Sequence, residues 1–163
     1  IKLLGRSRAI DDNTAEVMVA PFLLSKEHPL AMVHGVFNAV FVTGNMLGDS
    51  MYYGRGAGKL PTASAVVSDV VDCARHQGKV IMCFWDKEEV KLADIGEAER
   101  SFFIRAKAGA EDAVTAAFPG GRMVHLKDRK EDFGYFTQSM KEKDFQAKYE
   151  ALGGQMLGRI RLV

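Results

Sequence analysis

The alternation of apolar and polar positions begins at the N-terminus. Two apolar-rich runs, residues 1–8 and 16–24, lie on either side of the polar residues 11–13, which are Asp-Asp-Asn. Two such runs around a short polar turn predict a β-hairpin. Because Pro21 has no N–H to donate to a neighbouring strand, we expect the second strand to end there or to run along a sheet edge.

The next apolar segment, residues 31–43, is rich in valine and phenylalanine. We interpret it as a strand buried on both faces, with a helix as the alternative because short apolar runs are ambiguous by periodicity. Gly44 and Asn45 are typical of a turn. Residues 51–53 could form one more short strand.

A glycine-rich turn, residues 54–58, precedes a predicted helix. Pro61 favours the first helical positions, and the helix is expected to run from there to about Gln77, with Gly78 as its stop. One side of this helix is apolar, and its members are Ala63, Val66, Val67, Val70, Val71 and Ala74. The opposite side is polar, as in an amphipathic helix.

A change in composition follows the apolar run at residues 79–85. Residues 86–100 are highly charged, and we place a domain boundary near 85–98. Beyond it the pattern predicts a strand at 102–104, a helix at 111–118, strands at 123–126 and 133–137, a helix at 141–152 and a strand at 156–163. This β-α-β-β-α-β order predicts a ferredoxin-like unit. The expected class is α+β, with domains 1–85 and 86–163.

The overall composition is that of an ordinary globular protein. The chain has 163 residues, a net charge of +1 and 47% hydrophobic residues, which argues against intrinsic disorder and against a nucleic-acid-binding surface. Its longest apolar stretch, residues 33–42, is too short to span a membrane. Cys73 and Cys83 are interpreted as reduced thiols in small core positions of a cytoplasmic protein. Because the chain begins with Ile1 rather than Met, we expect a fragment that lacks an N-terminal piece.

Few residues suggest chemistry. The four histidines are scattered, none at metal-ligand spacing, and no catalytic residue stands out, so neither a metal site nor a catalytic group is assigned. The glycine-rich turn before a helix could let a backbone approach a ligand closely, with the helix N-terminus favouring an anion. Its G-x-G-x-G spacing fits neither a Walker loop nor a dinucleotide fingerprint. A tight turn that needs glycine only for packing is an equal alternative.

Two ordered motifs carry a family resemblance. The sequence HPLAMVHGVFNAV at residues 28–40 and the sequence GRGAGKLPTASAVVSD at residues 54–69 resemble the end of the catalytic region of homoserine dehydrogenase. The resemblance covers residues 1 to about 78. It implies an oxidoreductase that uses NADP or NAD to interconvert L-homoserine and L-aspartate 4-semialdehyde, in the pathway to threonine, methionine and isoleucine.

The resemblance also assigns parts of this enzyme to the chain. The nucleotide-binding Rossmann domain, the catalytic lysine and the homoserine-binding acids would lie before Ile1, so this chain alone is expected to be inactive. Gly58, with Gly56 and Ala57, would close on the cofactor from the substrate-domain side. Lys59 follows this loop and is not the catalytic lysine. A homodimer or a larger assembly is expected, since open sheet edges need partners.

Residues 101–163 stand where many bacterial members of the family carry a regulatory ACT domain. Such domains usually bind an amino acid at an Asp-x-Pro-Gly turn after their first strand. Here the turn is KAGAEDAV at residues 107–114, and of that pattern only Gly109 is present. Threonine is the possible effector, but a module that mainly makes protein–protein contacts is expected. The alternative function is a free-standing ACT-like module that binds an amino acid and has no catalysis.

Overall fold

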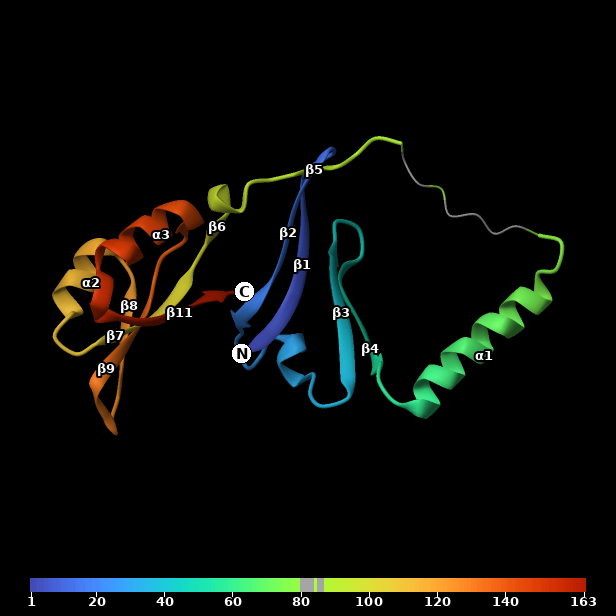
Figure 1. Ribbon diagram of the computed structural model, residues 1–163, viewed down its shortest axis with the longest axis horizontal. Helices are drawn as coiled ribbons and strands as arrows, with labels where there is room; N and C mark the ends of the chain where they lie inside the picture. The colour runs from blue at the N-terminus through green and yellow to red at the C-terminus, as the bar shows by residue number, and fades with distance from the viewer. Residues whose placement is uncertain (80–83, 85–86) are drawn as a thin grey trace. The chain divides into compact units, whose positions relative to one another are not determined.

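The computed structural model describes residues 1–79, 84 and 87–163 (Figure 1). It contains two compact units: Ile1–Leu24 together with Glu88–Val163, and Ser25–Lys87. The first unit therefore brings the two ends of the chain into one structure. A linear division into 1–85 and 86–163 stays a prediction about the domains. The apolar run at 79–85 and Cys83 lie mostly or wholly outside the described residues.

The predicted N-terminal hairpin is present in the first unit. Strands β1 (Lys2–Asp11) and β2 (Thr14–Leu23) pair antiparallel. The Asp11 carboxylate accepts the Asn13 N–H at 2.9 Å and closes the turn. This hydrogen bond to the charged form holds the pKa of Asp11 below its ordinary value of 3.8.

The expectation that β2 ends at Pro21 or forms an edge is wrong. The strand continues to Leu23 and lies between β1 and β11 (Met156–Leu162) in a seven-stranded sheet. The parallel pairing with β11 begins only at Phe22, opposite Arg161. The missing N–H of Pro21 is therefore tolerated, because the ladder on that side starts one residue later.

The β-α-β-β-α-β order of the C-terminal part is confirmed. Its elements are β7 (Phe102–Lys107), α2 (Glu111–Ala117), β8 (Arg122–Leu126), β9 (Arg129–Phe136), α3 (Glu142–Ala151) and β11. The four strands lie in the order β11-β7-β9-β8, with each neighbouring pair antiparallel. This is the ferredoxin-like arrangement, in which both crossovers are helices. The chain is thus of the α+β class.

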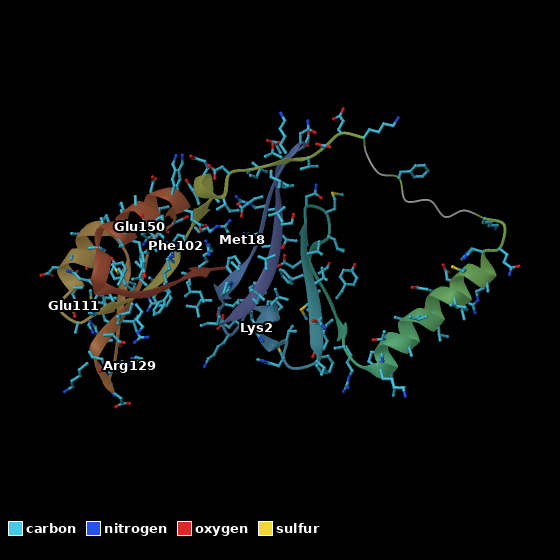
Figure 2. All side chains as sticks on the ribbon, in the orientation of Figure 1. Lys2, Met18, Phe102, Glu111, Arg129 and Glu150 are labelled. Carbon is cyan, nitrogen blue, oxygen red and sulfur yellow. The ribbon has the colours of Figure 1, made fainter. Side chains whose placement is uncertain are left out.

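The core of the first unit lies between this sheet and its two helices. Phe102 and Ile104 of β7, Val114 of α2 and Phe145 of α3 are completely or almost completely buried. The rings of Phe102 and Phe145 stack with centroids 3.6 Å apart. Figure 2 shows Phe102 within this layer and Arg129 at the turn between β8 and β9. Burying each such side chain contributes about 1.5–3 kcal/mol, so this layer supplies much of the stability.

Short elements complete this unit. They are β5 (Lys91–Leu92), the 3-10 helices η2 (Ile95–Glu97) and η3 (Gly153–Gln155), β6 (Glu99–Arg100) and β10 (Met140–Lys141). Strand β5 pairs parallel with β2, and β10 pairs antiparallel with β6. The described part of the charged segment at 86–100 is therefore attached to the sheet through the pairing of β5 with β2.

At η2, Glu97 makes ion pairs with Lys143 and Lys141. Hydrogen bonds from both lysines, with that of Lys143 the stronger influence, lower the pKa of Glu97 from its ordinary value of 4.5. A lowered carboxyl pKa means that this contact favours folding above about pH 4.5. Its contribution is lost as the pH falls through the lowered value.

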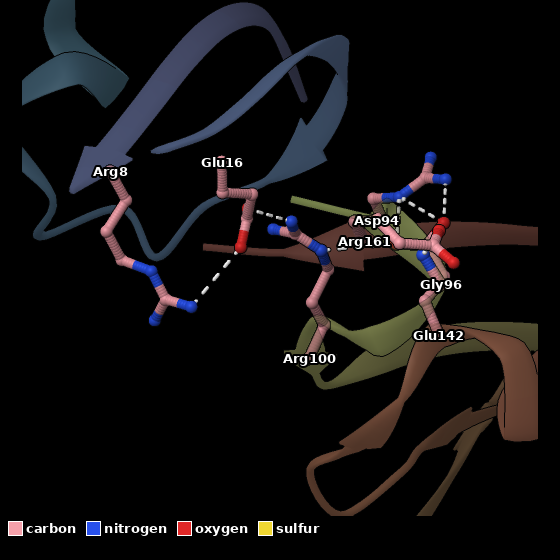
Figure 3. A network of polar contacts seen from close by, with 7 residues as sticks. All are labelled: Arg8, Glu16, Asp94, Gly96, Arg100, Glu142 and Arg161. Carbon is pink, nitrogen blue, oxygen red and sulfur yellow. Dashed lines mark hydrogen bonds and ion pairs between the residues drawn. The ribbon is translucent and has the colours of Figure 1, made fainter. Parts of the chain in front are cut away.

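A buried network of charges joins the hairpin to the C-terminal part (Figure 3). Arg100 of β6 donates to Glu16 of β2 and, at 3.1 Å, to Glu142 of α3. Arg161 of β11 also donates to Glu142, and Arg8 of β1 donates to Glu16 at 3.2 Å. The Arg100 and Glu16 side chains are each only 3% exposed. Every charge of this pair is therefore compensated where water is largely excluded.

The second unit contains η1 (Pro29–Met32), β3 (Phe37–Gly44), β4 (Gly48–Arg55) and α1 (Lys59–Arg75). The interpretation of 31–43 as a strand buried on both faces is wrong. The strand begins only at Phe37, and its residues alternate between half-buried and exposed positions. It pairs with β4 in a two-stranded sheet, and the side chains of Asn38, Val40 and Val42, which share one face, are exposed.

Helix α1 is close to its prediction but begins two residues earlier, with Pro61 as its third residue. Gly78, with φ +74°, follows its end. None of its residues is buried, and the predicted apolar stripe is exposed in this chain. The expectation that Cys73 is a core residue is wrong, because this thiol is exposed. No helix among the described residues is long and apolar enough to cross a membrane.

The buried network predicts an unequal response to two neighbouring charge removals. Glu16→Gln leaves Arg100 buried with one of its two carboxylates gone, and we expect it to lower the free energy of unfolding by about 3 kcal/mol. Asp12→Asn, in the exposed turn, should change it by less than about 0.5 kcal/mol. Urea unfolding followed by circular dichroism measures both.

A second variant separates charge from packing. The double variant, Glu16→Leu with Arg100→Met, removes both charges of this pair, so neither is left buried without the other. Its stability should therefore recover part of the loss seen for Glu16→Gln. Equal urea midpoints for Glu16→Gln and Asp12→Asn would contradict the role given to the network.

Candidate functional site

The candidate site is the glycine loop, defined as residues Gly56, Ala57 and Gly58, between β4 and α1. Both flanking elements belong to the second unit. The β3–β4 register places Asn38 opposite Gly54 and Phe37 opposite Arg55. The Gly56 N–H then donates to the Val36 carbonyl at 3.4 Å, which ties the loop to the open end of the hairpin. The loop is thus held at both ends by backbone contacts.

Gly58 has a backbone that favours glycine. Its φ is +122° and its ψ is 152°, a region that L-residues rarely adopt. It is the N-cap of α1, and its carbonyl accepts the first helical hydrogen bond from Thr62 N–H at 3.1 Å. A β-carbon at this position would also lie 3.4 Å from Cδ of Pro61. That distance is an ordinary contact, so the backbone conformation is what selects glycine here.

Gly56 is glycine for a different reason, which is close approach. A β-carbon built on Gly56 would overlap the side-chain amide of Asn38, with its Cγ at 3.1 Å. The sequence analysis did not find this neighbour. The signal available was an asparagine within a β-rich run, because strands are poor in asparagine.

The first turn of α1 is electropositive. Its opening N–H groups, those of Lys59 and Leu60, precede the first helical hydrogen bond, and Pro61 has none. The turn contains no acidic residue, and no side chain caps Gly58. The positive end of the helix dipole is therefore not offset by a neighbouring carboxylate within the turn.

Arg55, just before the loop, adds a fixed positive charge. Its guanidinium lies 5.3 Å from the ring centroid of Phe37, which in turn stacks on Tyr53 at 4.8 Å. This stack holds the guanidinium in place by cation–π attraction. The backbone and charges around the loop are suited to approach by an anionic ligand, but the loop itself carries no acid or base.

The histidines and acids do not form a second site. His28 Nδ1 accepts the Leu30 N–H at 3.1 Å and its ring packs on Phe41. His76 pairs with Asp72 on the exposed side of α1. Within the described ranges, no three His, Cys, Asp or Glu residues are grouped closely enough to hold a metal ion.

The backbone of Gly58 predicts a measurable cost of substitution. Gly58→Ala forces a β-carbon into a positive-φ conformation, and we expect a loss of about 1–3 kcal/mol in the free energy of unfolding of the second unit. Gly54→Ala is the matched control, since its β-carbon meets nothing within 4 Å and its φ is not positive. Hydrogen exchange of the amides in α1 measures both, and an equal effect would refute the argument from backbone conformation.

Comparison with known proteins identifies related sequences. The family model described as homoserine dehydrogenase matches residues 1–71, which include the glycine loop. A homoserine dehydrogenase from Synechocystis is 58% identical over 62 residues, covering 38% of this chain and 14% of that protein. One from Helicobacter pylori is 36% identical over 114 residues, covering 70% of this chain and 27% of that protein. This chain therefore spans less than a third of the length of these relatives.

Solved structures extend the similarity to the whole chain. A homoserine dehydrogenase from Thiobacillus denitrificans aligns with 99% of this chain and 42% of its own, with a TM-score of 0.75 and 27% identity. A homoserine dehydrogenase from S. aureus at pH 6.0 aligns with 99% of this chain and 41% of its own, with a TM-score of 0.69 and 25% identity. The C-terminal part, beyond the family match, thus also has a counterpart in these enzymes.

Proposed function

We propose that this chain, whose residues 1–71 match the homoserine dehydrogenase family model, is the part of an NAD- or NADP-dependent homoserine dehydrogenase that closes on the cofactor. The observation that carries the proposal is the glycine loop. The family match includes it, and two of its three residues are glycines that geometry selects.

The loop fits a dinucleotide in three respects. Gly56 and Gly58 carry no side chains of their own, so a ligand could approach the loop backbone on the side away from Asn38 and Pro61. The N–H groups of Lys59 and Leu60 suit phosphate or carboxamide oxygens. The charge of Arg55 favours an anion nearby. We assign Gly56, Ala57 and Gly58 to cofactor contact.

The reaction interconverts the alcohol of L-homoserine and the aldehyde of L-aspartate 4-semialdehyde, and the nicotinamide supplies the hydride acceptor or donor. The chain's own contribution is to bind and orient, because the loop has no acid or base. We therefore propose that the proton-transferring and homoserine-binding groups belong to segments of the enzyme other than the loop.

A chimaeric enzyme tests this assignment. The segment of the T. denitrificans enzyme that aligns with this chain is replaced by residues 1–163, and NADP⁺ reduction by L-homoserine is measured. We expect activity in the chimaera and none in the 163-residue chain by itself. Gly58→Ala in the chimaera should raise KM for the nucleotide about tenfold or more, since each 1.4 kcal/mol of lost binding is tenfold.

The controls decide between outcomes. Gly54→Ala in the same chimaera should leave KM for the nucleotide within about twofold. A chimaera that folds but lacks activity, or homoserine oxidation by the 163-residue chain alone, would refute the proposed division of labour.

For the C-terminal part, we propose an ACT-like regulatory-type module, and a free-standing amino-acid-binding module is the second candidate function. The β-α-β-β-α-β topology with its own core favours a module of this kind. Gly109, with φ +91°, makes the turn between β7 and α2 where an effector would bind.

Large exposed apolar residues on α1 and on β3–β4 support assembly into at least a dimer.

Thermal unfolding in the presence of an amino acid separates these candidates. A ligand at one hundred times its dissociation constant stabilises the folded state by about 2.7 kcal/mol. If the module binds an effector, L-threonine at millimolar concentration should raise Tm, whereas L-alanine at equal concentration should not. A flat Tm with both amino acids would reject the effector-binding candidate for threonine.

A further inference from the structure

Asn38 is the side chain nearest to the position that a β-carbon at Gly56 would take. The three heavy atoms nearest to a β-carbon built on Gly56 all belong to Asn38: Nδ2, which it would overlap, Cγ at 3.1 Å and Cβ at 3.6 Å. The carboxamide of the exposed Asn38 thus occupies the space that a β-carbon at position 56 would need, and it would have to shift to admit one. The contact is within one compact unit.

The register of the hairpin explains how the two residues meet. Asn38 pairs with Gly54, two residues before Gly56. The Gly56 N–H donates to the carbonyl of Val36, the residue just before β3. The loop therefore folds back over the start of β3. A side chain on this strand that reaches Gly56 can therefore contact the backbone of the loop.

The type of residue at position 38 is unusual for its place. The neighbouring positions on the same strand face, Val40 and Val42, are β-branched and apolar. A β-branched side chain is wide at Cβ, whereas asparagine carries its flat carboxamide one atom further out. A flat group of this length lies against a glycine backbone without displacing it.

We propose that Asn38 is a positioning residue for the cofactor: its carboxamide, packed on Gly56, sets the position of the loop backbone from Gly56 to Gly58. This inference rests on the proposed function, because it takes the loop to contact the nucleotide. Asn38 acts through Gly56 and need not touch the nucleotide. Asn38 and Gly56 form a matched pair, in which the size of one limits the size of the other.

A double-mutant cycle tests the pairing. In the 163-residue chain, Gly56→Ala should shift the amide NMR signals of Ala57 and Gly58, because the new methyl overlaps Asn38. In an Asn38→Ala background the same substitution should shift them much less, since only the β-carbon at 3.6 Å remains nearby. The isosteric Asn38→Asp should keep the loop signals near their original positions.

The KM for the nucleotide in the chimaera tests the effect of this pair on cofactor binding. Gly56→Ala should raise KM for the nucleotide about tenfold with Asn38 present and about twofold or less with Asn38→Ala, a coupling expected only of residues in contact. Asn38→Ala alone should raise KM for the nucleotide and leave KM for homoserine unchanged. The control cycle, Asn38→Ala with Gly44→Ala at the other end of the hairpin, should show no coupling.

The two proposals fail in different ways. Equal effects of Gly56→Ala in both backgrounds, in the NMR signals or in KM, would overturn the role of Asn38. A coupled NMR response in a chimaera without homoserine-dependent activity would leave the Asn38–Gly56 pair intact and refute the proposed function instead.

Discussion

The buried pairing of Arg100 with Glu16 and Glu142 is the interaction on which the first unit depends. A guanidinium that is almost fully excluded from water needs carboxylates on fixed elements, and these come from β2 and α3. The same Glu142 receives Arg161 from β11. One set of charges therefore fixes the hairpin, the short strand β6, the last helix and the last strand together. Apolar packing between β7 and its helices supplies much of the stability of this unit, while the charges tie the hairpin to β6, α3 and β11.

Local patterns predicted most of the elements. The hairpin around residues 11–13, helix α1 and the β-α-β-β-α-β order all follow from alternation, periodicity and turn residues. What the patterns missed was long-range. Pro21 lies inside a sheet because β11 pairs only with the residues beyond it. No local rule indicates that a strand from the other end of the chain arrives there, and the partners of Arg100 are equally distant along the sequence.

The sequence predicted the position of the glycine loop, but it indicated only one of the two reasons why glycine occurs there. Positive φ at Gly58 is what a glycine before a helix suggests. Gly56, by contrast, is glycine because of a side chain on another strand, and such a contact needs the β3–β4 register before it can be seen. The run at 31–43 was misread for a related reason. Its density of valine and phenylalanine predicts two buried faces, but the face that carries Asn38, Val40 and Val42 is exposed.

The parallel pairing of β2 with β11 affects how the chain is made. A ribosome releases β2 well before β11, because the other elements of the C-terminal part lie between them. Until β11 emerges, Phe22 and Leu23 lack their parallel partners, and until β6 emerges, Glu16 lacks its guanidinium partner. During synthesis this edge is the most exposed template for pairing with another strand, including one from a neighbouring nascent chain. Because β11 pairs with β2 only after it emerges, termination before Met156 would leave the hairpin without this partner and more prone to aggregation.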